Sequence, residues 1–141
     1  MRKILFRGKS ERFGNWVEGS LIIGRDLESD KLVYLIAPLS AYYTEVKKVV
    51  PETVGQYTGL TDKNGKMICE GDIGRYKQTD GAKINGKPII CIGKVVYNEK
   101  TVSFAIDSKD EIGAKNYDYF PIKDFEIIGN IHDNPGLLGN E

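Results

Sequence analysis

Glycine and proline interrupt this chain so often that few segments are long enough to form a helix. The 141 residues include 16 Gly and 5 Pro. Few windows repeat apolar residues at the 3.6-residue spacing of an amphipathic helix. The 8 Tyr residues favour pleated, half-buried strands. We therefore expect a mainly β protein, in which short strands and tight turns form a sandwich or a small barrel.

Strand-like segments follow one another along the chain. In 101–106, apolar residues alternate with small or polar ones, which predicts a half-buried strand. The apolar run 33–37 suits a strand that is buried on both faces. A long strand is expected over 88–97, where Gly93 predicts a bulge or bend. The remaining strands are expected over 4–6, 16–23, 44–50, 73–77 and 125–131.

Turn signals separate these segments. Asn64-Gly65 tolerates the positive φ of a tight turn, so its flanking segments should form a hairpin. A second pair, Asn85-Gly86, is placed in a polar loop. Pro51 suits the first position of one helical turn over 51–56. We expect a solvated loop over 107–116 and a flexible tail over 132–141.

Charge is balanced overall but uneven along the chain. The formal net charge is zero, which argues against a protein that coats nucleic acid. Residues 61–100 carry 8 Lys or Arg and 5 Asp or Glu, whereas residues 101–141 carry 3 and 8. A basic middle and an acidic end could draw two copies together or pack within one chain.

The two cysteines, Cys69 and Cys91, are too few for a disulfide framework. Free buried thiols in a reducing cytoplasm are the favoured interpretation, and a single bridge between strands is the alternative. The apolar run near the N-terminus has three residues, too few for a signal peptide, and apolar stretches of membrane-spanning length are missing. We expect a cytoplasmic protein of one domain that does not associate with membranes.

The segment 81–88 begins like a phosphate-binding P-loop. That loop requires Ser or Thr after its lysine, to hold magnesium, and then a helix. Here Pro88 follows Lys87, and the next residues are typical of a strand. An ordinary loop is therefore the favoured interpretation, and no cofactor is expected.

Glu70 and Asp72 are a pair of carboxylates two residues apart. On one face of a strand they could act as an acid and a base, or bind a hard cation. The favoured alternative is a turn in which Asp72 binds local backbone amides.

His132 is the only histidine, so a histidine-based metal site within one chain is excluded. Its place in the tail, beside Asp133, favours a solvated side chain over a catalytic one. We expect no catalytic residues, no metal site and no enzyme activity.

Aromatic and basic residues are interleaved along the sequence, a pattern that can stack bases and follow phosphates. Ordinary packing in a β domain is the favoured alternative, because a nucleic-acid recognition signature is missing. The aromatic residues of this pattern are Tyr42, Tyr43, Tyr57, Tyr76, Tyr97, Tyr117 and Tyr119. The basic residues are Lys47, Lys48, Arg75, Lys77, Lys83, Lys87 and Lys94.

The stretch 51–66, PETVGQYTGLTDKNGK, followed by Glu-Gly-Asp-Ile at 70–73, resembles the central signature of the YopX family. The opening around 4–8, the segment 93–97 and the ending around 125–135 are similar to other parts of the family pattern. Gly74 and His132 depart from that pattern, and 78–88 looks like a variable insertion.

The resemblance implies a phage or prophage origin, a bacterial host cytoplasm, and an SH3-like barrel at about 54–131 with packed N-terminal strands at about 1–50. It supplies no catalytic residues. We expect a non-catalytic binding or assembly module that binds a second copy of itself or another protein. The expected partner-binding residues are Gln56, Tyr57, Thr58, Glu70 and Asp72. The alternative is nucleic-acid binding by 61–100, with Lys63, Lys66, Arg75, Lys77, Lys83, Lys87 and Lys94.

Overall fold

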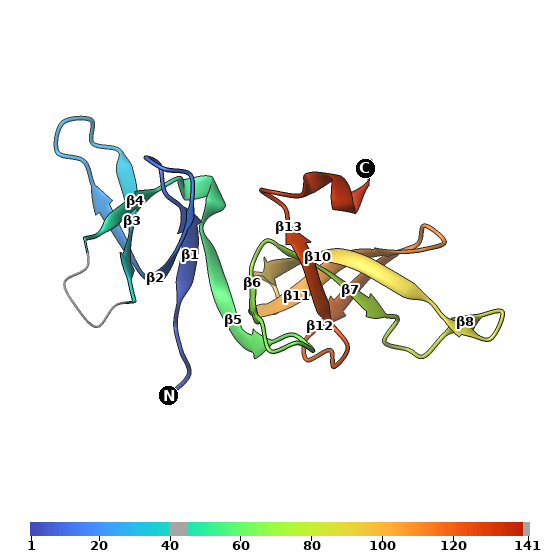
Figure 1. Cartoon of the computed structure of the whole chain (residues 1–141). Coiled ribbons are helices and arrows are strands. Elements are labelled where there is room, and N and C mark those ends of the chain that lie inside the picture. Colours follow the sequence, from blue (N-terminus) through green and yellow to red (C-terminus); the bar gives the residue numbers. More distant parts are fainter. Residues whose placement is uncertain (40–44, 140–141) are drawn as a thin grey trace. The chain divides into compact units, whose positions relative to one another are not determined.

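The computed structural model describes residues 1–39 and 45–139, and it is mainly β (Figure 1). The chain divides into two compact units, Met1–Tyr57 and Thr58–Glu141. Antiparallel strands form the sheets of both, and two short 3-10 turns are the helical elements of the described residues. Within this part of the chain, no helix has the length and apolar character needed to cross a membrane.

The strands of the first unit belong to a six-stranded antiparallel sheet with the order β4-β3-β2-β1-β5-β6, of which most of β5 and all of β6 are part of the second unit. Alternate residues of these strands turn inward, so that Val17, Ile36 and Val49 form a small buried core. On β1, Arg7 and Lys9 lie over the ring of Trp16, at 4.8 and 5.5 Å from its centroid. The first four strands are β1 (Phe6–Lys9), β2 (Trp16–Arg25), β3 (Leu32–Pro38) and β4 (Lys47–Val49).

Proline does start a helical turn after β4, as predicted, in the form of the 3-10 turn η1 (Pro51–Thr53). The Thr53 hydroxyl donates to the Val50 carbonyl at 2.6 Å and accepts the Lys9 backbone N–H at 2.8 Å. This ties the turn to β1. The next strand, β5 (Gly55–Thr61), pairs with β1 at its start and continues into the second unit.

The second unit contains a five-stranded antiparallel sheet with the order β12-β11-β10-β7-β13. Among the described residues β12 and β13 do not pair, so the expected barrel is present only as open antiparallel sheets. The elements of this unit after β5 are β6 (Met67–Cys69), β7 (Asp72–Lys77), β8 (Lys83–Ile84), β9 (Lys87–Pro88), β10 (Ile90–Asn98), β11 (Ser103–Asp110), β12 (Lys115–Tyr119), β13 (Glu126–Asn130) and the 3-10 turn η2 (Pro135–Leu138).

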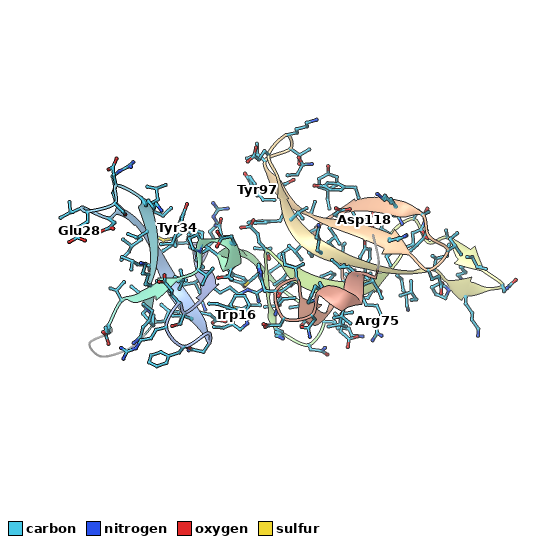
Figure 2. The ribbon with its side chains drawn as sticks, turned by 90° about the horizontal axis from the view of Figure 1, so that it is seen from above. Trp16, Glu28, Tyr34, Arg75, Tyr97 and Asp118 are labelled. Carbon is cyan, nitrogen blue, oxygen red and sulfur yellow. The ribbon has the colours of Figure 1, made fainter. Side chains whose placement is uncertain are left out.

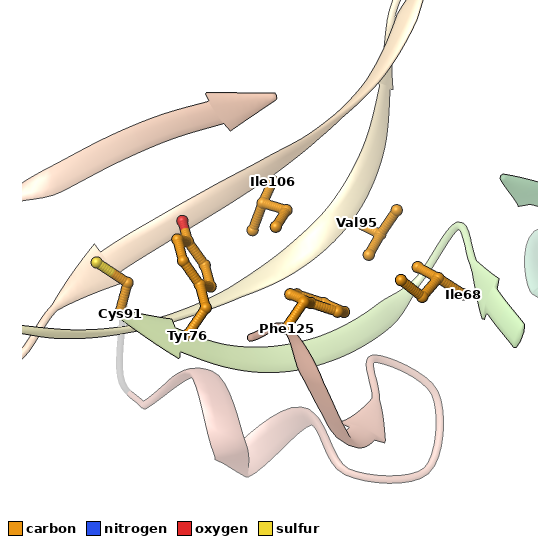
Figure 3. Close-up of a cluster of buried hydrophobic side chains, with 6 residues drawn as sticks. All are labelled: Ile68, Tyr76, Cys91, Val95, Ile106 and Phe125. Atoms are coloured by element: carbon orange, nitrogen blue, oxygen red, sulfur yellow. The ribbon is translucent and has the colours of Figure 1, made fainter. Parts of the chain in front are cut away.

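One face of this sheet carries the hydrophobic core (Figure 3). The ring of Phe125 packs directly over Gly74, where an added Cβ would lie 2.0 Å from the Phe125 Cζ. Gly74 therefore makes room for the largest apolar side chain of the cluster. Burying such a side chain contributes about 1.5–3 kcal/mol. The buried residues of the cluster are Ile68, Tyr76, Cys91, Val95, Ile106 and Phe125.

The predicted hairpin around Asn64-Gly65 is confirmed. The Gly65 φ is +81°, and the Asp62 N–H donates to the Lys66 carbonyl at 2.7 Å between β5 and β6. Asn85-Gly86, expected in a polar loop, instead forms the turn of the β8-β9 hairpin. Both residues have positive φ, 52° and 76°, which is the geometry of a two-residue hairpin turn.

Two predictions about the second sheet were wrong. The segment 107–116 is not one solvated loop, because β11 continues to Asp110 and β12 begins at Lys115. Gly93 causes no bulge, since its pairing with both neighbouring strands is continuous. Its Cβ would lie 2.4 Å from the Ser108 Cβ, so glycine is needed there for close strand packing. The register shift of this sheet lies instead between Ile127 and Gly129.

Cys69 and Cys91 are both buried and free, which favours the thiol interpretation over the bridge. The segment expected to be a flexible tail contains the η2 turn, and its Leu137 packs closely against Gly129. Of the predicted strand 44–50, residues 47–49 form β4, and residue 44 lies outside the described residues.

Candidate functional site

The predicted partner-binding residues of β5 are used within the fold. The Tyr57 N–H donates to the Leu5 carbonyl at 2.8 Å, and the Thr58 hydroxyl donates to the Ile68 carbonyl at 2.8 Å. Gln56 is half-buried and pairs with Phe6 of β1. Thr58 thereby fastens β5 to β6, a structural role for a polar side chain.

Glu70 and Asp72 do not share one face of a strand, because β7 begins at Asp72 and the intervening Gly71 has a φ of +86°. The Asp72 carboxylate is 2% exposed and accepts the Cys69 N–H at 2.8 Å. This is the turn arrangement that the alternative interpretation expects. Within the described ranges, no three His, Cys, Asp or Glu residues are grouped so that they could hold a metal ion.

The segment that begins like a P-loop forms the β8-β9 hairpin and leads into β10. Phosphate binding by such a loop needs the N-terminus of a helix, and here a strand takes that place. Lys83 and Lys87 are exposed on this hairpin.

His132 is half-buried rather than solvated. Its backbone N–H donates to the Asn130 Oδ1 at 3.0 Å, and its ring lies beside Gly71. The turn after β13 therefore places this side chain next to the turn before β7.

A polar network inside the core was not predicted. The Tyr76 hydroxyl lies 2.7 Å from the Ser108 Oγ and donates to the Asp118 Oδ2, while the Thr79 hydroxyl donates to the Asp118 Oδ1 at 3.0 Å. Burial and the bond to Asp118 raise the pKa of Tyr76 above its usual value. Tyr76 is thus held neutral, as a hydrogen-bond donor. Figure 2 labels Asp118, which β12 brings to Tyr76.

Cys91 lies near this network, and its Sγ accepts a weak hydrogen bond from Asn116 at 3.8 Å. Burial, with the nearby Asp118 and Asp110 carboxylates, raises the pKa of Cys91 to about 11. A nucleophilic cysteine requires a depressed pKa, because the thiolate is the reactive form. The network and the thiol therefore have the properties of a structural core.

The structural role of the Asp62 carboxylate was also not predicted from the sequence. It is 7% exposed and accepts the backbone N–H groups of Asn64, Lys66 and Ile127 at 2.9, 2.9 and 3.0 Å. Burial raises the pKa of Asp62, but these three donors outweigh it and lower the pKa overall. Asp62 links the hairpin turn to β13.

The other face of the five-stranded sheet is the candidate binding surface. Residues paired across neighbouring strands share a face, and Arg75, Ile92, Lys109 and Lys115 pair in one row across β7, β10, β11 and β12. They alternate with the buried residues of the core, which form the core face. We call the opposite surface the open face, and its polar and aromatic side chains include Arg75, Lys94, Lys109, Lys115, Tyr117 and Tyr119.

The structure gathers some of the predicted basic residues and separates the others. Arg75, Lys77 and Lys94 alternate onto the open face, whereas Lys63 and Lys66 lie in the β5-β6 hairpin and Lys83 and Lys87 in the β8-β9 hairpin. Lys109 and Lys115 were missed because their segment was assigned to a loop. The alternation Lys-Asn-Tyr-Asp-Tyr over 115–119 was the signal that could have found Lys115. Tyr42 and Tyr43 lie outside the described residues.

A groove of about 520 Å³ lies beside the row of cations, between β10, β11 and the η2 turn. Arg75 and Lys109 line it together with Ile92 and Leu137. Its size is that of a site for a small molecule or for one unit of a polymer. Arg75, labelled in Figure 2, comes to this groove from β7.

Comparisons with known proteins identify a family and similar solved structures. The crystal structure of protein EF1440 from Enterococcus faecalis is similar at 20% identity and a TM-score of 0.49, over 98% of this chain and 99% of that chain. None of the curated proteins matches this chain. The family model described as YopX protein matches residues 5–139, nearly the whole sequence. The chain therefore belongs to the YopX family.

Proposed function

We propose that this protein is a non-catalytic binding module whose binding surface is the open face of the second sheet. The observation that carries the proposal is the placement of exposed Lys109, Lys115, Tyr117 and Tyr119 on one surface. Exposed cations and aromatic rings that gather on one face of a rigid sheet are suited to recognition.

The core face supports the non-catalytic part of this proposal. Its hydroxyl and carboxylate groups bind one another, and the pKa values of Tyr76 and Cys91 are raised, which keeps both side chains neutral. A nucleophile or general base near pH 7 would need the opposite shifts.

The proposal also includes an SH3-like arrangement of the second sheet. Four strands, β7, β10, β11 and β12, form a meander, and β13 returns to pair with β7. This order is compatible with an SH3-like sheet. Because β12 is an edge strand with backbone groups open on one side, a second copy of the chain is one partner that the proposal includes.

Light scattering of the purified protein, with absorbance at 260 and 280 nm recorded in the same run, tests the proposal. We expect bound mass in the wild type, either a second copy or nucleic acid, and its loss in the Lys109→Glu, Lys115→Glu variant. The matched control is Lys83→Glu, Lys87→Glu on the β8-β9 hairpin, which should keep the bound mass. Equal masses for all three proteins would contradict the proposal.

A further inference from the structure

We propose that the open face binds single-stranded nucleic acid, with phosphates on the row of Arg75, Lys109 and Lys115 and unpaired bases stacked on Tyr117 and Tyr119. This inference rests on the proposed function and names the chemistry of the partner. From the sequence, a basic site was predicted along the segment 61–100. The proposal places the site instead on one face of the sheet, to which β7, β10, β11 and β12 contribute.

The row has the length of a short piece of backbone. Arg75, Ile92, Lys109 and Lys115 occupy neighbouring strands in register, so the row crosses three strand spacings. At about 4.8 Å for each spacing, it extends for about 15 Å. Tyr117 and Tyr119 follow Lys115 at every second residue of β12, so the rings lie beside one end of the row.

Two of the cations have no ion-pair partner among residues 1–39 and 45–139. Lys109 and Lys115 are directly opposite each other, and in the described parts of the chain neither has a carboxylate within ion-pair distance. Like charges in directly opposite positions repel, so an anion on this face would relieve the repulsion. The phosphate backbone is such an anion.

The carboxylates near this row of cations already bind other groups of the fold. The Glu126 carboxylate binds Lys63 at 2.9 Å and Arg75 at 3.3 Å, so Arg75 keeps part of its charge for a ligand. The Glu111 carboxylate accepts the Ile90 N–H at 3.2 Å. Asp107 of β11 is directly opposite Lys94 on one neighbouring strand and Tyr117 on the other. Its negative charge therefore limits the cationic surface around Lys94. The positive end of the open face is therefore the Lys109–Lys115 end.

The tyrosines favour a single strand over a duplex. Tyr117 and Tyr119 are 44% and 46% exposed, and their rings meet edge to face at 5.6 Å. The Asn98 amide donates to the Tyr119 hydroxyl at 3.2 Å and so orients that ring. Aromatic side chains stack on bases that are free of a partner strand, and each such contact tolerates any base. Duplex bases offer no comparable ring face.

Fluorescence anisotropy with labelled single-stranded DNA and RNA of about 12 nucleotides tests the inference, in a titration repeated at several salt concentrations. Lys109→Ala, Lys115→Ala should reduce the slope of log K against log salt by about 1.4, since each single-strand phosphate contact contributes about 0.7. Tyr117→Leu and Tyr119→Leu should each weaken binding about 5- to 150-fold with an unchanged slope. The control Lys83→Ala, Lys87→Ala should alter neither quantity.

Three outcomes would overturn the inference: no binding by the wild type, equal binding by all variants, or equal competition by poly-glutamate. The last would indicate an acidic protein partner in place of nucleic acid. If the oligonucleotides do not bind but light scattering still shows open-face-dependent mass, the binding-module proposal stands and the nucleic-acid inference fails. Because the substituted side chains are exposed, an unchanged circular dichroism spectrum and a cooperative urea transition will show that each variant is folded.

Discussion

The two faces of the five-stranded sheet come from the same strands and differ in almost every physical property. The core face buries Tyr76, Val95 and Ile106 and satisfies its polar groups internally. The open face exposes Lys109 on β11, the strand that also buries Ile106, and Tyr117 on the neighbouring β12. Alternation along a strand thus separates folding from recognition. Ile73 and Ala105 share the open face by register but are fully buried. The comparison therefore predicts that substitutions of buried residues change stability and that substitutions of the exposed open-face residues change binding.

The largest expected effect is on the core face at Gly74. Gly74→Ala places a Cβ against the Phe125 ring, and overpacking of this kind should cost about 3 kcal/mol in the free energy of unfolding. Urea denaturation measures this loss. Gly136→Ala is the control, because no atom of the described residues lies within 4 Å of its added Cβ. A second variant, Gly74→Ala with Phe125→Leu, should recover part of the loss, and strict additivity would refute the packing explanation.

A smaller loss is expected from the polar network. Asp118→Ala removes the acceptor of Tyr76 and Thr79 and should cost about 2 kcal/mol, the range for hydrogen bonds to charged groups. In the double variant with Tyr76→Phe the loss should be less than the sum of the single losses. Oligonucleotide affinity, measured on folded protein, should stay near that of the wild type. A change in affinity without a change in stability would place Asp118 in the binding surface.

Asp62 tests whether stability also depends on groups outside the core face. Asp62→Asn should lower the free energy of unfolding by about 1–2 kcal/mol at pH 7. The substitution replaces the charged carboxylate, which accepts hydrogen bonds from three backbone N–H groups, with a neutral amide. The folded-state pKa lies below the ordinary value of 3.8, so the carboxylate stabilises the fold above that value. The difference between variant and wild type should therefore shrink as the pH falls below about 4. Urea titrations at pH 7 and pH 3 measure it, and a constant difference would contradict this role.

The smallest effect on stability is expected on the open face. Lys109→Ala, Lys115→Ala removes a directly opposed pair of like charges, so the unfolding free energy should rise by no more than about 0.5 kcal/mol. Thermal unfolding at low and high salt provides the measurement. The gain should fade at high salt, because screening already weakens the repulsion. A loss of more than 1 kcal/mol would mean that these lysines belong to the fold.

The sequence predicted the β class, the hairpin at Asn64-Gly65, the turn at Pro51 and the family, since each depends on local patterns. The candidate site needed more than local patterns. Tyr76 and Asp118 are 42 residues apart, and their contact depends on the order of strands in the sheet. Lys115 was assigned to a loop because 107–116 is rich in charged residues, which hid the alternation that begins at Lys115. Gly93 resembled a bulge because the close approach of Ser108 is visible only after pairing.

The five residues of β12 place Asp118 and Asn116 on the core face and Lys115, Tyr117 and Tyr119 on the open face. One inserted or deleted residue in this strand would exchange the two sets, because the side-chain period is two. Asp118 would then turn to solvent, and a tyrosine would enter the space beside Tyr76. Over evolutionary time the strand should therefore vary by substitution and keep its length. Among the described contacts, the β8-β9 hairpin does not supply residues to both faces of the sheet, so its length should vary freely.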